Sequence, residues 1–197
     1  MKVIESRNLD TINHELYANN FPLRIQDVLG NVAAQFDGES PLYILEGGSG
    51  YGNILGGIKD FLRIHGREAH TTGATKNLAH IPFSRDNNID RLIVGQLEKY
   101  YRGSVPDVYH LIIDYCGAVF YDTACNRVLD GATMLPLYAR LLRPGGRLLM
   151  RLDHMNQAIK YQSARETREV TRSILRIYHL EEIIQPIRSP IVFAQKI

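Results

Sequence analysis

The chain has 197 residues, of which 45% are hydrophobic and 22% are charged, and its formal net charge is +2. These values are typical of a globular protein of one domain, and so small a net charge does not by itself indicate nucleic-acid binding. Two cysteines, Cys116 and Cys125, are too few for a disulfide framework or a metal centre. No apolar run approaches the roughly 20 residues that span a bilayer, and the N-terminus lacks the apolar core of a signal peptide. We therefore expect a cytoplasmic protein with reduced thiols.

Helical and strand patterns alternate along the chain after a polar N-terminal segment. Residues 1–20 show no clear period, and we interpret them as an arm or a short helix. Helices are predicted where apolar residues recur at three and four positions, and strands where apolar residues run together between turn signals. In chain order the predicted elements are a helix at 22–36, a strand at 42–46, a helix at 52–64, strands at 68–74 and 78–83, a helix at 89–101, a strand at 108–114, a helix at 130–142, a strand at 147–152, a helix at 155–178 and short strands at 181–186 and 191–194.

This alternation predicts the fold class. Continuous apolar strands that alternate with helices indicate an α/β protein with a mostly parallel sheet covered on both faces. The last two predicted strands are separated by only the four residues 187–190. So short a connection can join only antiparallel neighbours, and the chain is therefore expected to end in an antiparallel hairpin.

Residues 43–57, with the sequence YILEGGSGYGNILGG, are the most informative segment for function. A short apolar strand meets an acid, Glu46, and glycines follow at the alternate positions Gly48, Gly50 and Gly52, with Gly47 as an extra. Glycines let the backbone take conformations closed to other residues and let a ligand approach the main chain. A carboxylate beside such a turn suits a cationic or hydroxyl-bearing ligand.

The spacing narrows the class of ligand. Counted from Gly48, a dinucleotide fingerprint would need glycine or alanine where Asn53 stands, which disfavours NAD. A phosphate-binding P-loop would need a lysine at its end, and none follows before Lys59. The spacing that fits is Glu/Asp-x-Gly-x-Gly-x-Gly, which resembles motif I of the class I S-adenosylmethionine-dependent methyltransferases. The alternative is a glycine-rich turn with no ligand.

Two further segments carry this resemblance. Residues 141–150, LLRPGGRLLM, look like the Leu-Leu-Lys-Pro-Gly-Gly-x-Leu segment before the fifth strand of that family. Residues 107–114, DVYHLIID, resemble its fourth strand, which begins with an Asp and ends at the active site. The resemblance implies a Rossmann-like three-layer fold with a mostly parallel seven-stranded sheet and a C-terminal antiparallel hairpin. It further implies one domain over residues 21–197, preceded by an arm or lid at 1–20.

The resemblance also implies S-adenosyl-L-methionine as cofactor. Glu46 and Asp114 would end the two central strands at the edge where open α/β sheets bind ligands. The residues predicted to hold the cofactor around the glycine loop are Glu46, Gly47, Gly48, Gly50, Tyr51, Gly52 and Asp114. The family's ribose-binding acid after strand two is absent here, so Thr75 and Asn77 are predicted in its place, and Asp86 is predicted to meet the adenine.

The catalytic residues are predicted from their position in the family's strand order. Methyl transfer is an in-line displacement in which the enzyme mainly positions the nucleophile and excludes water, and a base is needed only when the acceptor holds its proton tightly. Tyr115 and His154 are predicted to form the floor of the site, with His154 as the base because an imidazole titrates near pH ~6.5. The alternative for His154 is a surface residue beside the following helix. No histidine spacing suggests a metal site.

We therefore predict a methyltransferase that acts on a small-molecule acceptor, without nucleic acid or a membrane span. The residues after Asp114 do not form the Asn/Asp-Pro-Pro-Tyr motif of methyltransferases that modify amino groups of bases or glutamine. The alternative function is a non-catalytic methyltransferase-like module that binds a nucleotide-type ligand or a protein partner, and the missing ribose acid favours it. In the enzyme, residues 1–20 would act as a lid, with His14 and Tyr17 near the acceptor.

Overall fold

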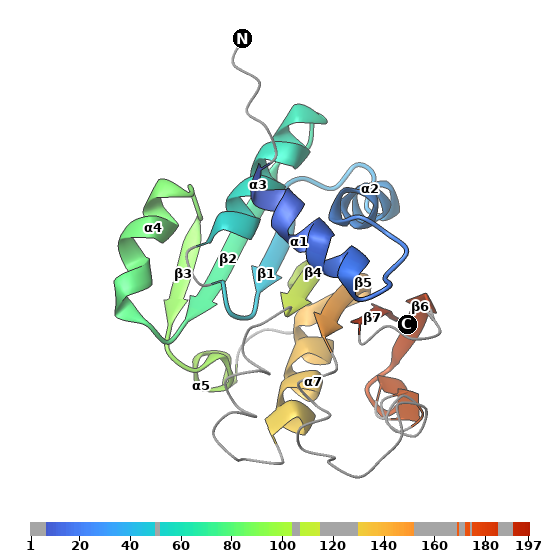
Figure 1. Cartoon of the computed structure of the whole chain (residues 1–197). Helices are drawn as coiled ribbons and strands as arrows, with labels where there is room; N and C mark the ends of the chain where they lie inside the picture. The colour runs from blue at the N-terminus through green and yellow to red at the C-terminus, as the bar shows by residue number, and fades with distance from the viewer. Residues whose placement is uncertain are drawn as a thin grey trace.

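A computed structural model describes residues 7–49, 52–103, 107–114, 130–151, 169, 172–173, 175–184 and 191–197. The helices are α1 (Arg7–Ala18), α2 (Ile25–Gln35), α3 (Asn53–Ile64), α4 (Ile81–Asp86), α5 (Leu97–Tyr100) and α7 (Asp130–Leu141), and a short 3-10 helix, η1, covers Leu78–His80. The strands are β1 (Leu42–Glu46), β2 (Ala69–Thr75), β3 (Arg91–Val94), β4 (Tyr109–Asp114), β5 (Leu142–Arg151), β6 (Leu180–Ile184) and β7 (Ile191–Lys196). Their arrangement is shown in Figure 1.

The strands form one seven-stranded sheet in the order β3-β2-β1-β4-β5-β7-β6. Strands β1 to β5 are parallel to one another, whereas β7 runs antiparallel to both β5 and β6. The predicted fold class, including the C-terminal antiparallel pair, is confirmed. The chain proceeds outward in one direction from β1 and in the other from β4, so the strand order reverses between these two strands. Ligands of open α/β sheets bind at such a point.

Alternate residues of the central strands contribute to two hydrophobic cores, one on each face of the sheet. Ile44 of β1 and Leu111 of β4 pack in one core with residues of α1, α2 and α3. Leu45 and Ile112, one residue further on, pack in the other with residues of α5 and α7. Successive side chains of a strand point to opposite faces, so both faces are apolar and the sheet lies between two helical layers.

The predicted strand at 78–83 is wrong, and so is most of the predicted helix at 89–101. Residues 78–86 form η1 and α4, with Pro82 in the first turn of α4, where its missing N–H costs no hydrogen bond. Residues 91–94 form β3, which pairs in parallel with the end of β2. A four-residue apolar run cannot be assigned by periodicity alone, and pairing with β2 decides its conformation.

Helix α1 packs in the hydrophobic core that it shares with α2 and α3. Leu9, Ile12 and Leu16 recur at helical spacing, are at most 1% exposed, and belong to the same core as α2 and α3. Asn13 also ties α1 to α2: its Oδ1 accepts from the Ile25 amide at 2.8 Å and its Nδ2 donates to Gln26 at 2.8 Å. In Figure 1 this helix crosses in front of the central strands. The short-helix interpretation of the N-terminal segment is confirmed for residues 7–18, and a domain division at residue 20 stays a prediction.

Candidate functional site

The central strands β1 and β4 end in two buried carboxylates. Glu46 is 5% exposed and Asp114 is 3% exposed. Glu46 lies beside Ile113, the residue before Asp114, in the parallel register of these strands. The sequence prediction that both acids end neighbouring strands at one edge of the sheet is therefore confirmed. This edge is also the place where the strand order reverses.

Backbone hydrogen bonds hold the start of the glycine loop to the strands on either side of β1. The Gly47 amide donates to the Ile113 carbonyl of β4 at 2.9 Å, and the Ser49 amide donates to the Ala74 carbonyl of β2 at 2.8 Å. Gly47 and Ser49 are therefore held across the carboxyl edge of the sheet. Gly52, which precedes α3, closes the turn by donating to the Ser49 carbonyl at 2.6 Å.

Two positions of the loop require glycine for conformational reasons. Gly48 has φ +151° and Gly52 has φ +81°, values that residues with a side chain rarely adopt. A Cβ on Gly52 would also lie 2.2 Å from Cδ1 of Ile89. Gly48 and Gly52 therefore serve the turn itself. Gly50 and Tyr51, also predicted to bind the cofactor, lie outside the described residues.

Glu46 has a carboxylate oxygen with no hydrogen-bond partner in the described part of the chain. This atom, Oε2, is buried. Burial, and after it the charge of Asp114, raises the pKa of Glu46 to about 8. Asp114, by contrast, accepts a 2.6 Å hydrogen bond from the Tyr138 hydroxyl of α7. An unsatisfied buried carboxylate oxygen is costly, so the site fits a ligand that brings a cation or a hydrogen-bond donor to Glu46.

A cluster of neutral polar side chains stands at the end of β2. Thr75 Oγ1 accepts from the Asn77 amide at 3.1 Å and lies 2.9 Å from Nδ1 of His80. Asn77 Oδ1 accepts from the Ala79 amide, so its Nδ2, 3.2 Å from Nε2 of His80, donates to that nitrogen. The His80 proton is then on Nδ1 and is donated to Thr75, which leaves the Thr75 hydroxyl hydrogen directed elsewhere. Sequence reasoning missed His80, because residues 78–83 were predicted as a strand.

Asp86 is not where the sequence placed it. The sequence predicts it as the acid after strand three, but β3 is Arg91–Val94 and Asp86 ends α4, the helix that precedes β3. There it borders a small hollow of about 100 Å³ with Gly56, Lys59 and Asp60 of α3. The structure therefore gives no support for grouping Asp86 with Glu46 and Asp114. The predicted catalytic residues, Tyr115 and His154, lie outside the described residues.

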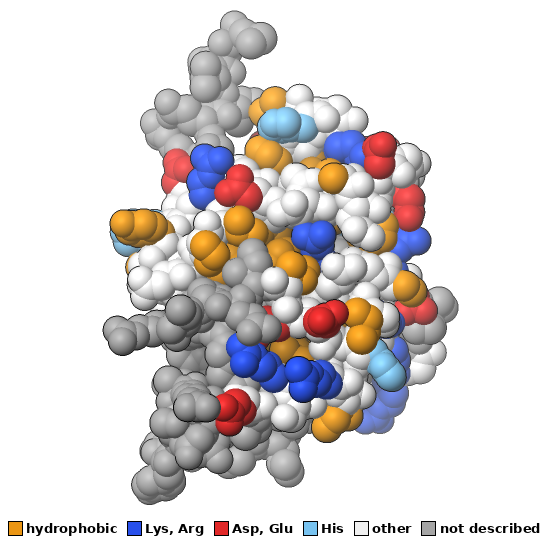
Figure 2. Space-filling model, turned by 90° about the vertical axis from the view of Figure 1, so that its right-hand side faces the viewer, with side chains coloured by type: hydrophobic (Ala, Val, Ile, Leu, Met, Phe, Trp, Pro, Cys, Tyr) orange, Lys and Arg blue, Asp and Glu red, His pale blue; other side chains and the backbone are white. Residues whose placement is uncertain are grey.

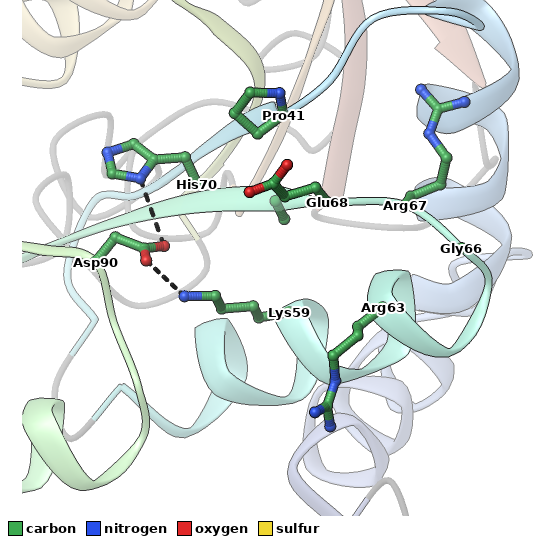
Figure 3. Close-up of a pocket in the computed structure, with 9 residues that line it drawn as sticks. Pro41, Lys59, Arg63, Gly66, Arg67, Glu68, His70 and Asp90 are labelled. Atoms are coloured by element: carbon green, nitrogen blue, oxygen red, sulfur yellow. Dashed lines mark hydrogen bonds and ion pairs between the residues drawn. The ribbon is translucent and has the colours of Figure 1, made fainter.

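A larger hollow, of about 370 Å³, lies beside the starts of β1 and β2, at the opposite end of these strands (Figure 3). It is lined by Pro41, Lys59, Arg63, Gly66, Arg67, Glu68, Ala69, His70 and Asp90. The lysine and arginine charges of the hollow are paired with carboxylates: Lys59 with Asp90 at 2.5 Å, Arg67 with Asp37 at 3.1 Å and Arg63 with Asp60 at 2.9 Å. We assign no ligand to it. No group of His, Cys, Asp and Glu side chains suited to a metal ion occurs in the described part of the chain.

No family model and no curated protein matches this chain by sequence. Solved structures do match it by fold. A TehB-like S-adenosylmethionine-dependent methyltransferase of Corynebacterium glutamicum superposes with a TM-score of 0.54, covering 97% of both chains at 15% identity. The fold is that of the class I S-adenosylmethionine-dependent methyltransferases.

Other solved structures agree with this fold. A protein of Staphylococcus aureus described as a caffeoyl-CoA O-methyltransferase matches with a TM-score of 0.59 at 13% identity, over 95% of this chain and 91% of that one. A protein of Listeria monocytogenes described as a class I S-adenosylmethionine-dependent methyltransferase matches with a TM-score of 0.58 at 12% identity. The match covers 87% of this chain but only 59% of the Listeria chain. At these identities the likeness shows the fold alone, so the function must be argued from the site.

Proposed function

We propose that this protein binds S-adenosyl-L-methionine at the carboxyl edge of the sheet and transfers its methyl group to a small-molecule acceptor. The observation that carries the proposal is the buried, unpartnered Oε2 of Glu46, next to Asp114 and at the foot of the glycine loop. The cofactor carries an ammonium group and a sulfonium centre, and either would offset the cost of the two neighbouring carboxylates. The methyltransferase fold of the sheet supports the same assignment.

Each of the predicted site residues would have its own role in binding the cofactor or the acceptor. Glu46 and Asp114 would bind the cationic end of the cofactor, and the loop from Gly47 to Gly52 would let it lie against the main chain. Thr75 would donate a neutral hydrogen bond to the ribose, and Asn77 and His80 would hold the Thr75 hydroxyl in place. The bound cofactor supplies an activated methyl group. Tyr115 and His154 keep their proposed places beside the acceptor.

The charge distribution on the surface fits a small-molecule acceptor better than it fits a nucleic acid. On the face of the molecule shown in Figure 2, Lys and Arg side chains are interspersed with acidic and hydrophobic ones instead of forming one basic field. Sequence-independent binding of nucleic acid depends on such a field. In the described part of the chain no helix has the length and apolarity needed to cross a membrane. The predicted cytoplasmic location stays a prediction.

The second candidate function is a binding module without catalysis. The observation that favours it is the neutral cluster at the end of β2, where Thr75, Asn77 and His80 offer no charged acceptor to the ribose hydroxyls. The enzyme requires both cofactor binding and methyl transfer, whereas the module would bind a nucleotide-type ligand or a protein partner without methyl transfer. Turnover of the cofactor to S-adenosylhomocysteine with any member of a broad acceptor panel supports the enzyme. Binding without turnover across the panel supports the module.

The ribose contact gives a specific test of the site. Replacing Thr75 with valine is expected to lower affinity for S-adenosylhomocysteine about two- to tenfold, because a neutral hydrogen bond contributes ~0.5–1.5 kcal/mol. Thr72→Val makes the same change on the same strand, three residues further from the carboxyl edge, and should leave affinity unchanged. Calorimetric titration of both variants measures this, with NAD as a ligand that should not bind. Equal affinities for the two variants would remove Thr75 from the site.

A further inference from the structure

Tyr138, on α7, is a buried polar residue that the sequence did not single out. It is 0% exposed and its ring lies in the hydrophobic core on the α7 side of the sheet, with Leu45 and Ile112. Its hydroxyl nevertheless reaches the carboxyl edge and donates to Oδ2 of Asp114 at 2.6 Å. A hydrogen bond to a charged acceptor is among the stronger ones in a protein. The residue therefore connects the apolar core directly to the proposed cofactor site.

The same hydroxyl explains why residue 47 has no side chain. A Cβ placed on Gly47 would lie 2.2 Å from the Tyr138 hydroxyl oxygen, 3.2 Å from its Cζ and 3.3 Å from Oδ2 of Asp114. The Tyr138 hydroxyl thus occupies the space that any side chain at position 47 would need. Gly47 is also the residue whose amide ties the loop to β4. The loop, Asp114 and Tyr138 therefore form one packed unit.

The surroundings of Glu46 disfavour its ionised form. Asp114 is the charged group that acts on Glu46 from β4, and Tyr138 acts on it from α7 through Asp114. On the other side, β2 places Gly73 opposite Glu46 in the register. The Lys59 ammonium of α3 is bound to Asp90 and the Asn88 carbonyl. Neither β2 nor α3 thus brings a cation to Glu46 in the part of the chain that the structure describes, and ionising Glu46 beside Asp114 is unfavourable.

We propose, building on the function proposed above, that Tyr138 is a positioning residue: it holds Asp114 against the glycine loop so that Asp114 and Glu46 together receive the cofactor's ammonium group, and cofactor binding releases one proton. In the free protein Glu46 retains its proton. When the ammonium group binds, Glu46 is ionised and its proton passes to solvent. No covalent bond of the cofactor or of the chain changes in this step.

The proposal has a definite pH dependence. Burial and the charge of Asp114 raise the pKa of Glu46 to about 8, so below that pH the proton must be lost on binding. Affinity should therefore increase with pH, by at most about tenfold per pH unit, and level off above pH 8. Without the Tyr138 hydroxyl, the doubly ionised pair loses a hydrogen bond to Asp114 that stabilises it. Tyr138→Phe is then expected to lower affinity at neutral pH about tenfold or more and to move the levelling-off to higher pH.

The first experiment is calorimetric titration of the full chain with S-adenosylhomocysteine between about pH 6 and about pH 8.5, in buffers of different ionisation enthalpy that count the released protons. Tyr109→Phe is the matched control: Tyr109 is a buried tyrosine of the same core, and its hydroxyl is bonded to that of Tyr101. The control should show wild-type affinity and proton release. An unchanged affinity and pH profile in Tyr138→Phe overturns the role of Tyr138, while wild-type protein that binds no S-adenosylhomocysteine at any pH contradicts the proposed function itself.

A second experiment needs no ligand and reports on the packed unit alone. Gly47→Ala should lower the thermal unfolding midpoint strongly in the wild-type background, since its Cβ meets the Tyr138 hydroxyl oxygen. In the Tyr138→Phe background the closest remaining contacts are 3.2 and 3.3 Å, and the same change should lower the midpoint much less. Equal losses in both backgrounds would show that the hydroxyl does not occupy this space, and would overturn the proposal independently of cofactor binding.

Discussion

Glu46→Gln should abolish measurable cofactor binding and at the same time stabilise the free protein above pH 8. The carboxyl of Glu46 has an ordinary pKa of 4.5, and burial followed by the charge of Asp114 raises it to about 8 in the folded protein. Between these values the folded chain binds more protons than the unfolded chain, so stability decreases as pH rises through this window. The slope is at most about 1.4 kcal/mol per pH unit for one group. A neutral glutamine removes this pH dependence of stability, but a glutamine cannot offer a negative charge to the cofactor.

Urea unfolding of wild type and variant at about pH 5.5 and about pH 8.5 measures the stability half of this expectation. At the lower pH, about one pH unit into this window, wild type should be less stable than Glu46→Gln by only about 1.4 kcal/mol. Near the higher pH, Glu46→Gln should be the more stable by a larger margin. Glu68→Gln is the control, because Glu68 is an exposed carboxylate at the opposite end of the strands, just before β2. Parallel pH profiles for wild type and Glu46→Gln would contradict the assignment of Glu46 as a strained, buried acid.

The strands that the sequence predicted well are those buried on both faces, because their apolar composition alone marks them. The runs around β1 and β4 are continuously apolar because both faces of the central sheet are covered. The run at Arg91–Val94 has only four residues and lies at the edge of the sheet, where its conformation depends on pairing with β2. Its spacing continues into Leu97–Tyr100, which is helical. The two elements therefore merged into one apparent helix.

The candidate site shows the same difference between residues marked by local spacing and residues placed by tertiary packing. Glu46, the glycines and Asp114 are recognisable because each lies at the end of a clear strand and the local spacing carries the information. Tyr138 comes from a distant helix, and no local spacing links it to Asp114. His80 was assigned to a strand, in which its ring would not reach back to Thr75, whereas the turn of η1 brings it there. Contacts that depend on tertiary packing are the part that sequence patterns did not predict.

Deleting residues 1–20 should unfold the protein or leave it barely folded, and this is the second large effect that we expect. The deletion removes Leu9, Ile12 and Leu16, which are at most 1% exposed in the core shared with α2 and α3. It also removes the hydrogen bonds of Asn13 to the start of α2. Truncating one buried leucine typically costs about 2–5 kcal/mol, and whole domains are stable by only about 5–15 kcal/mol. Far-ultraviolet circular dichroism and urea unfolding of the truncated chain test this.

Two adjacent residues of α1 separate this structural role from the proposed role as a lid. Leu16→Ala should lower the free energy of unfolding by about 2–5 kcal/mol, because Leu16 is 1% exposed. Tyr17→Ala should change it by less than about 0.5 kcal/mol, because Tyr17 is 82% exposed. If the helix also covers the acceptor, Tyr17→Ala should reduce methyl transfer while cofactor affinity stays at the wild-type value. If truncated protein lacking residues 1–20 unfolds at the wild-type urea midpoint, α1 is dispensable for the core, and the division of the chain at residue 20 is correct.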